Sequence, residues 1–250
     1  MSLTLSTTAA VAKLTLNTGR FFVERWTAHR RDKFLESLLE NLQVEQATGD
    51  RSADVDAALD NLLSSDQGSE LLYDAYRRVC FSKTKNFGPR IIGLLTAELL
   101  NSALTSDEDE EMIFEAAEKL GDLELIEFKR HYEWLLKEIE KDATLKRSVM
   151  RSGDEIIEVA SEEGNEVGSH LDSEAHLYPP DLRSSHGPWA ARLESFGFIA
   201  RSVTQQTRQV KEDSERHIDY DQTWVFTIVT LTYKPATMRL YKLLCRARNE

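Results

Sequence analysis

The stretch nearest to a catalytic pattern contains Glu127 and Lys129, which are separated by one residue in the segment LELIEFK. On a β-strand, an acid and a lysine at this spacing would suit a metal-dependent nuclease, in which carboxylates hold a divalent ion and the lysine lies near the attacking water. Asp107 or Asp109 could supply the further acid. On a helix the two side chains would point to different sides. The apolar spacing described below favours the helix.

Metal ligation has one candidate pattern, an alternation of histidines and acids: His170, Asp172, Glu174 and His176. A mobile acidic loop does not hold ligands in place, so we expect these side chains to be solvated. The other four histidines are isolated in the sequence, and we expect surface or hydrogen-bonded core positions for them: His29, His131, His186 and His217. His131 can pair with Glu127 one helical turn earlier.

Motifs that tie spacing to mechanism, such as HExxH, GxSxG, GxGxxG and a phosphate-binding loop, do not occur. Cys80 and Cys245 lie far apart without a CxxC pair, which favours buried thiols over a disulfide framework or a zinc site. We therefore predict no catalytic, cofactor-binding or metal-ligating residue and no cofactor, and the sequence leans away from an enzyme.

Basic residues near the C-terminus are the remaining candidates for contact with a partner. Residues 183–250 contain 11 basic and 7 acidic side chains, whereas residues 51–182 contain 14 and 30. The candidate residues for nucleic-acid or partner contact are Arg192, Arg201, Arg239, Lys242, Arg246 and Arg248. Acidic residues in the loop expected over residues 204–222 would repel the phosphates of a nucleic acid: Asp213, Glu215, Asp219 and Asp221.

Three helices joined by short connections are predicted between Phe81 and Lys141. The first follows Gly88 and Pro89 and is the predicted core helix, because its leucines and isoleucines recur at helical spacing. Ser106 and Asp109 resemble a capping box for the second. The third carries an apolar stripe at helical spacing: Leu125, Phe128, Tyr132, Leu135, Leu136 and Ile139.

The sequence predicts a mainly α protein in which a multi-helix N-terminal body, residues 1–150, precedes a small C-terminal α/β unit, residues 188–250. Between them, residues 151–187 are expected to form an acidic linker, since 152–182 contain no lysine or arginine. Two strands are predicted at 198–203 and 224–232, joined by a charged loop over 204–222 and followed by a helix that begins at Pro235.

The net charge of −12 argues against non-specific binding of nucleic acid or an anionic membrane by the whole molecule. No stretch is long and apolar enough to span a bilayer, and the N-terminus lacks the pattern of a signal peptide. We therefore expect a cytoplasmic protein.

The order helix, strand, loop, strand, helix is typical of the second half of a winged-helix unit. The segments LESFGFIARSV and WVFTIVTLTYKPATMRLYKLL resemble the ending of many winged-helix proteins. Together with the helical first half, residues 70–250 resemble the uncharacterised Abi-alpha-like bacterial proteins, some of which are linked to abortive infection. The chain departs from that family after the last strand, where Lys234, Pro235 and Ala236 replace the usual glycine.

The expected function is that of a non-enzymatic protein-interaction or regulatory protein, for which the resemblance implies a bacterial role in phage defence. A protein partner or self-association is the expected contact. The alternative is a DNA-binding regulator that acts through the winged-helix-like unit, and a metal-dependent nuclease ranks below both.

Overall fold

The computed structural model describes residues 27–42, 66–102, 107–140, 149–166, 182–211 and 221–247. It divides into two compact units, one made of residues 1–123 with 243–250 and the other of residues 124–242. These boundaries do not coincide with the predicted divisions after residues 150 and 187. The fold class is confirmed, because a mainly helical chain carries a small α/β unit in its C-terminal half.

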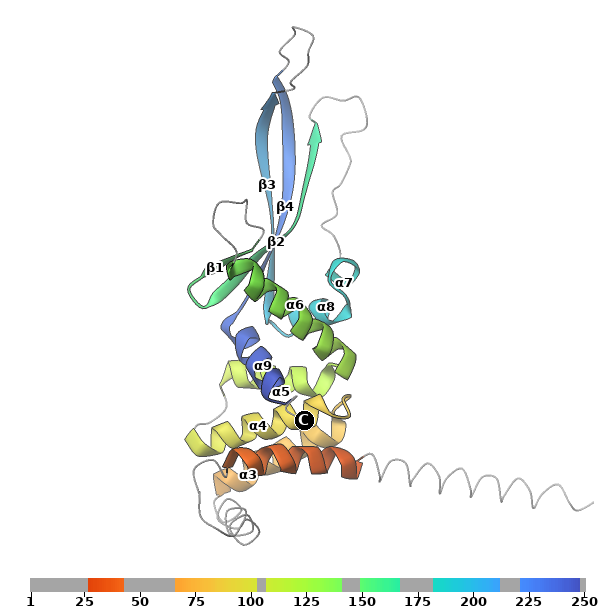
Figure 1. Ribbon diagram of the computed structural model, residues 1–250, viewed down its shortest axis with the longest axis vertical. Helices are drawn as coiled ribbons and strands as arrows, with labels where there is room; N and C mark the ends of the chain where they lie inside the picture. Colours follow the sequence, from red (N-terminus) through yellow and green to blue (C-terminus); the bar gives the residue numbers. More distant parts are fainter. Residues whose placement is uncertain are drawn as a thin grey trace, which may run out of the picture. The chain divides into compact units, whose positions relative to one another are not determined.

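The first unit is helical in its described part. It contains a helix over residues 27–42, α3 (Asp66–Phe81), α4 (Phe87–Ser102) and α5 (Glu108–Lys119) (Figure 1). The α4 helix is its core element, as predicted, since Ile91, Ile92 and Leu95 are fully buried. Both α3 and α5 pack against it.

The start of α5 differs by one residue from the prediction. Asp107, not Ser106, is the N-cap residue, and Glu110 takes the place predicted for Asp109. The Asp107 carboxylate accepts from the amide of Glu110 at 2.9 Å, and Glu110 Oε2 accepts from the amide of Asp107 at 2.6 Å. The longer glutamate can reach back to the N-cap amide, which explains the shift.

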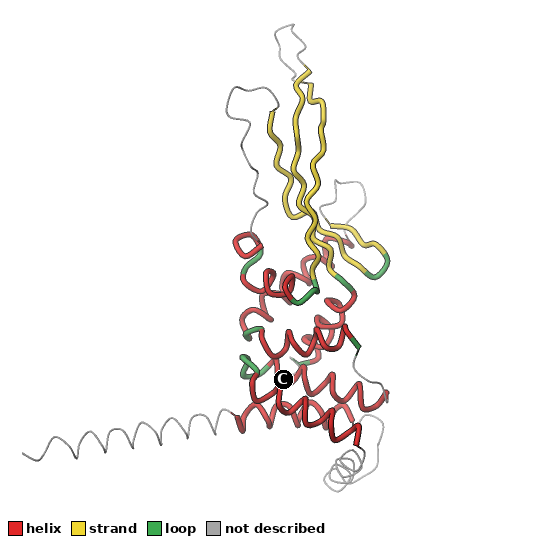
Figure 2. The backbone as a smooth tube through the Cα atoms, turned by 180° about the vertical axis from the view of Figure 1, so that it is seen from behind, coloured by secondary structure: helices red, strands yellow, loops and turns green. Residues whose placement is uncertain are grey.

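The second unit contains most of α6 (Asp122–Glu140), a four-stranded sheet, α7 (Leu182–Ser185), α8 (Pro188–Ser195) and the first part of α9 (Pro235–Arg246). The strands are β1 (Val149–Ser152), β2 (Glu155–Glu166), β3 (Ile199–Lys211) and β4 (Asp221–Tyr233), in the antiparallel order β1-β2-β4-β3. Figure 2 shows β2, β3 and β4 side by side as long yellow strands.

The predicted acidic linker is wrong over residues 155–166, which form β2 and pair with β4. Ile156 and Ile157 thus lie on a strand. The net charge of the segment misled the prediction, because alternate strand positions face opposite sides and only the inward side chains need apolar or hydrogen-bonded surroundings. A tight turn at Gly153, which has φ of 61°, joins β1 to β2.

The predicted loop over 204–222 is also wrong in part, since residues 204–211 continue β3 and residues 221–222 belong to β4. Residues 204–206 are exposed, and antiparallel strands tolerate polar side chains on exposed positions. The order helix, strand, strand, helix is confirmed through α8, β3, β4 and α9, while the winged-helix assignment stays a prediction. None of the described helices is long and apolar enough to cross a membrane.

Candidate metal centre

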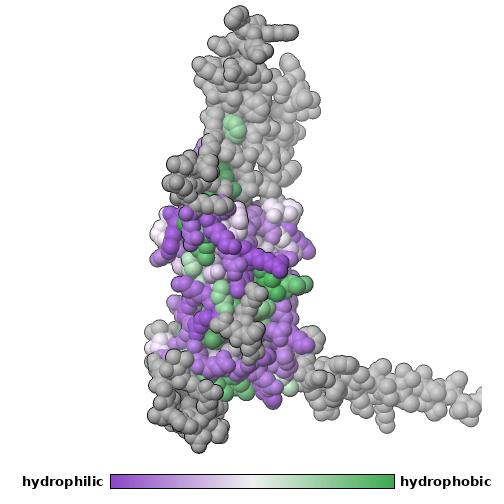
Figure 3. Space-filling model, viewed as in Figure 1, coloured by the Kyte–Doolittle hydropathy of each residue, from purple (hydrophilic) through white to green (hydrophobic). Residues whose placement is uncertain are grey.

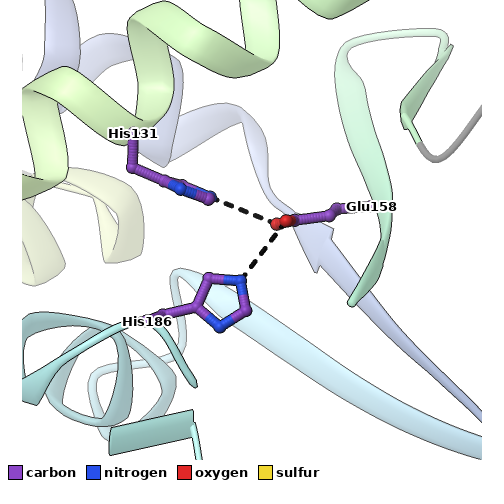
Figure 4. A group of neighbouring side chains, drawn as sticks. All are labelled: His131, Glu158 and His186. Atoms are coloured by element: carbon purple, nitrogen blue, oxygen red, sulfur yellow. Dashed lines mark hydrogen bonds and ion pairs between the residues drawn. The ribbon is translucent and has the colours of Figure 1, made fainter. Parts of the chain in front are cut away.

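Polar side chains from four separate segments meet in the second unit. His131 lies on α6, Glu158 on β2, His186 directly after α7, and Tyr233 at the end of β4. Figure 4 shows the two imidazole rings approaching the Glu158 carboxylate from different elements. The chain thus brings together residues that are at least 27 positions apart.

The distances are those of a connected cluster. His131 Nε2 lies 3.2 Å from Glu158 Oε2, and His186 Nε2 lies 3.3 Å from Glu158 Oε1. The Tyr233 hydroxyl donates to Glu158 Oε2 at 2.6 Å and lies 2.9 Å from His131 Nε2. One ligand atom each from His131, Glu158 and His186 lies within 4.8 Å of the other two.

The α6 helix places His131 at the edge of the core. Its stripe of Leu125, Phe128, Tyr132 and Leu135 is buried, as the sequence predicts. His131 follows Phe128 by three positions and therefore lies beside that stripe. Its side chain remains 18% exposed.

Sheet pairing places Glu158 next to Tyr233. Ile156 and Glu158 are two residues apart on β2, so their side chains lie on one face of the sheet, and both are buried. Ile156 lies opposite Tyr233 in the β2–β4 register. Glu158 is therefore a diagonal neighbour of Tyr233, within reach of its long side chain.

The connection between α7 and α8 holds His186. Its amide donates to the carbonyl of Leu182 at 2.9 Å, which ends α7. Gly187 follows with φ of 102°, a value that favours glycine, and Pro188 begins α8. Ser185 Oγ lies 2.8 Å from His186 Nδ1, so the other ring nitrogen, Nε2, faces Glu158.

Aromatic rings surround the cluster. The His131 ring lies 5.2 Å from the ring of Trp189, 5.3 Å from that of Trp134 and 5.1 Å from that of His186, measured between centroids. Trp189 is buried, whereas Trp134 is 40% exposed. Glu158 and Tyr233 are themselves only 5% and 1% exposed, so hydrogen bonds to the carboxylate are little screened by water.

The carboxylate is held in its charged form. Burial works to raise the pKa of Glu158, but hydrogen bonds from His131, His186 and Tyr233 outweigh it and lower that pKa to about 2. Burial, together with the neighbouring Glu158 charge, raises the pKa of Tyr233 far above its ordinary value. Glu158 thus acts as an acceptor and Tyr233 as a donor.

Two imidazole nitrogens and one carboxylate form a donor set that suits a divalent ion. Ligand atoms about 2.1 Å from a tetrahedral ion lie about 3.4 Å apart. Since the three candidate atoms lie within 4.8 Å of one another, an ion would have to draw the most distant pair together by at most about 1.4 Å. Without an ion, the same side chains form a buried hydrogen-bonded network.

The basic residues predicted to contact a partner are partly engaged within their own units. Arg192 pairs with Glu124 at 2.6 Å, Arg201 with Glu194 at 3.1 Å, and Arg246 with Glu98. Arg239 and Lys242 lie on α9, and Arg248 lies outside the described residues. A phosphate would have to compete with glutamates for three of these six side chains.

Within the described part of the chain, the other sequence candidates do not assemble into a site. Glu127 and Lys129 lie on α6, and Lys129 pairs with Glu133 at 3.7 Å, so the strand that the nuclease arrangement requires is replaced by a helix. His29 contacts Asn86 at 3.0 Å. The remaining candidates fall outside the described part of the chain: His170, Asp172, Glu174, His176 and His217.

Sequence reasoning missed the cluster. In the sequence, His131 and His186 stand isolated, Glu127 is the partner predicted for His131, and Glu158 lies in the expected linker. The spacing of 27 residues from His131 to Glu158 and 28 from Glu158 to His186 matches no ligand motif. Strand periodicity would not have found it either, because Ile157 and Val159 are apolar on the opposite face and would predict an outward-facing Glu158.

No protein-family model, curated protein or solved structure matches this chain. The resemblance to Abi-alpha-like proteins therefore stays a prediction.

Proposed function

We propose that this protein binds one divalent transition-metal ion, of the class of zinc, between His131, Glu158 and His186. The observation that carries the proposal is the convergence of their three ligand atoms within 4.8 Å. The ligands come from α6, β2 and the α7–α8 connection, so the ion would tie three elements of the unit together. Binding would thereby stabilise the folded α/β unit.

The donor set favours zinc and its neighbours over magnesium or calcium. Imidazole nitrogen suits zinc, copper, iron and nickel, whereas magnesium and calcium prefer oxygen ligands. Ser185 supplies a further argument, because metal-bound histidines usually engage their second ring nitrogen with an outer partner. Ser185 Oγ lies at that position for His186, 2.8 Å from Nδ1.

The test is calorimetric titration of Zn²⁺ into the full chain after chelator treatment. We expect one ion per chain in the wild type and loss of that binding in His186→Ala and Glu158→Gln. His29→Ala is the matched control, because this partly exposed histidine lies in the other unit, where it contacts Asn86, and its loss should leave binding unchanged. Absence of zinc binding by the wild type, or equal binding by His186→Ala, would overturn the proposal.

Contact with a protein partner is the second candidate function, and exposed aromatic residues on α3 favour it. Tyr73 is 73% exposed and Phe81 is 71% exposed. The described surface seen in Figure 3 is mainly hydrophilic, with a few hydrophobic patches. Large exposed aromatic side chains are typical of contact surfaces. Sedimentation of the full chain should show self-association that Tyr73→Ser with Phe81→Ser reduces, and a monomer at all concentrations would argue against this contact.

A further inference from the structure

Tyr233 touches two of the three proposed ligand residues. Tyr233 is 1% exposed. Its hydroxyl donates to Glu158 Oε2 at 2.6 Å, and the hydroxyl oxygen lies 2.9 Å from His131 Nε2. Glu158 Oε1 instead faces His186 Nε2 at 3.3 Å. The two oxygens of the carboxylate therefore have different surroundings.

We infer that Tyr233 is a positioning residue, which holds Glu158 Oε2 so that the carboxylate binds the ion through Oε1 alone. This inference rests on the proposed metal site. A hydrogen bond from a buried hydroxyl competes with the metal for the lone pairs of Oε2, and rotation of the carboxylate would break it. The Tyr233 hydroxyl thus favours a carboxylate that binds the ion through one oxygen over a carboxylate that binds it through both.

The consequence is an open coordination position on the ion. Two imidazoles and one carboxylate oxygen give three protein ligands, and zinc sites of this kind complete a tetrahedron with water. A carboxylate that bound through both oxygens would fill that position. Tyr233 would therefore determine whether the bound ion can accept one small ligand, such as water, from outside the protein.

Tyr233→Phe tests the inference because it removes the hydroxyl and keeps the ring. We expect zinc affinity to fall by about 10- to 100-fold, which is the usual effect of removing an outer partner of a metal ligand. With Co²⁺ as a spectroscopic substitute, the released Oε2 should also bind the ion. The visible spectrum of the bound cobalt should then differ from the wild-type spectrum, because a carboxylate oxygen replaces the water in the fourth position.

Tyr132→Phe is the matched control. Like Tyr233, Tyr132 belongs to the second unit and is only 1% exposed. The centroids of the two rings lie 6.3 Å apart. Its pKa is raised to about 12, chiefly by burial. Loss of its hydroxyl should leave both the zinc affinity and the cobalt spectrum as in the wild type.

The outcomes separate this inference from the proposed function. If the wild-type chain binds neither zinc nor cobalt, the metal site itself fails. If the wild type binds and Tyr233→Phe shows the same cobalt spectrum, with or without a loss of affinity, the positioning role is wrong and the site stands. Appearance of tyrosinate absorption when the wild type binds metal would also overturn the inference, since Tyr233 would then be a ligand.

Discussion

Glu158 is a nearly buried carboxylate that three side chains satisfy, and its removal should be costly. Replacement by alanine leaves His131, His186 and Tyr233 without their shared acceptor. Because buried hydrogen-bond donors lose their acceptor, Glu158→Ala should lower the free energy of unfolding of the metal-free chain by about 1–3 kcal/mol in urea denaturation. Glu155→Ala, at the partly exposed start of the same strand, should change it by less than about 0.5 kcal/mol. Equal effects of the two variants would contradict a satisfied network.

Gly88 occupies a position in α4 that has no room for a side chain. A Cβ atom there would collide with Thr84 Oγ1, the carbonyl oxygen of Ala117 and Ser82 Oγ, all of which are enclosed. Helix propensity favours alanine over glycine by about 1 kcal/mol, but overpacking a tight site costs about 1–3 kcal/mol or more. Gly88→Ala should therefore lower the melting temperature. An increase would show that Ser82, Thr84 and Ala117 can shift to make room for the Cβ atom at little cost.

The residues of the site illustrate what a sequence can predict. The burial of Phe128 and Tyr132 follows from helical spacing, which is a local property, and the structure confirms it. The approach of His131 to Glu158 depends on how α6, β2 and α7 pack together. That packing leaves no periodic signal in the order of the residues, so the cluster emerged only from the structure.

At the scale of single elements, α5 depends on its capping box. Asp107→Ala removes the acceptor for the Glu110 amide and should lower the free energy of unfolding by about 1 kcal/mol, within the usual range of about 0.5–2 kcal/mol. Ser106→Ala, at the position that the sequence suggested for the cap, should have an effect below about 0.5 kcal/mol. Chemical denaturation of both variants distinguishes the two assignments, and the reverse order would contradict the observed cap.

The helices were predictable and part of the sheet was not. The α4, α5 and α6 helices follow from apolar spacing with proline, acid and glycine signals at their ends. The β4 strand follows from its β-branched and aromatic residues. The β2 strand does not, because its acids suggest a solvated linker. Its pairing depends on the tertiary structure: β4 pairs with β3 along one edge, and residues 155–166 pair with its other edge, which would otherwise have unpaired backbone groups.

At the scale of the whole molecule, the proposed ion belongs to one unit. His131, Glu158, His186 and Tyr233 all lie within residues 124–242. Saturating zinc should therefore slow amide hydrogen exchange in β2 and in residues 182–195, where local opening would release a ligand. Exchange in α3, α4 and α5 should change little. Equal protection across both units would mean that zinc acts on the chain as a whole and not through this site.

The most direct test of the account is an anomalous difference map at the zinc absorption edge, from crystals of the full chain grown with Zn²⁺. We predict a strong peak about 2.0–2.2 Å from Nε2 of both His131 and His186 and from an oxygen of Glu158. A map with no peak between these three side chains, in crystals that contain zinc elsewhere, would contradict the metal site and leave the cluster as a buried hydrogen-bonded network.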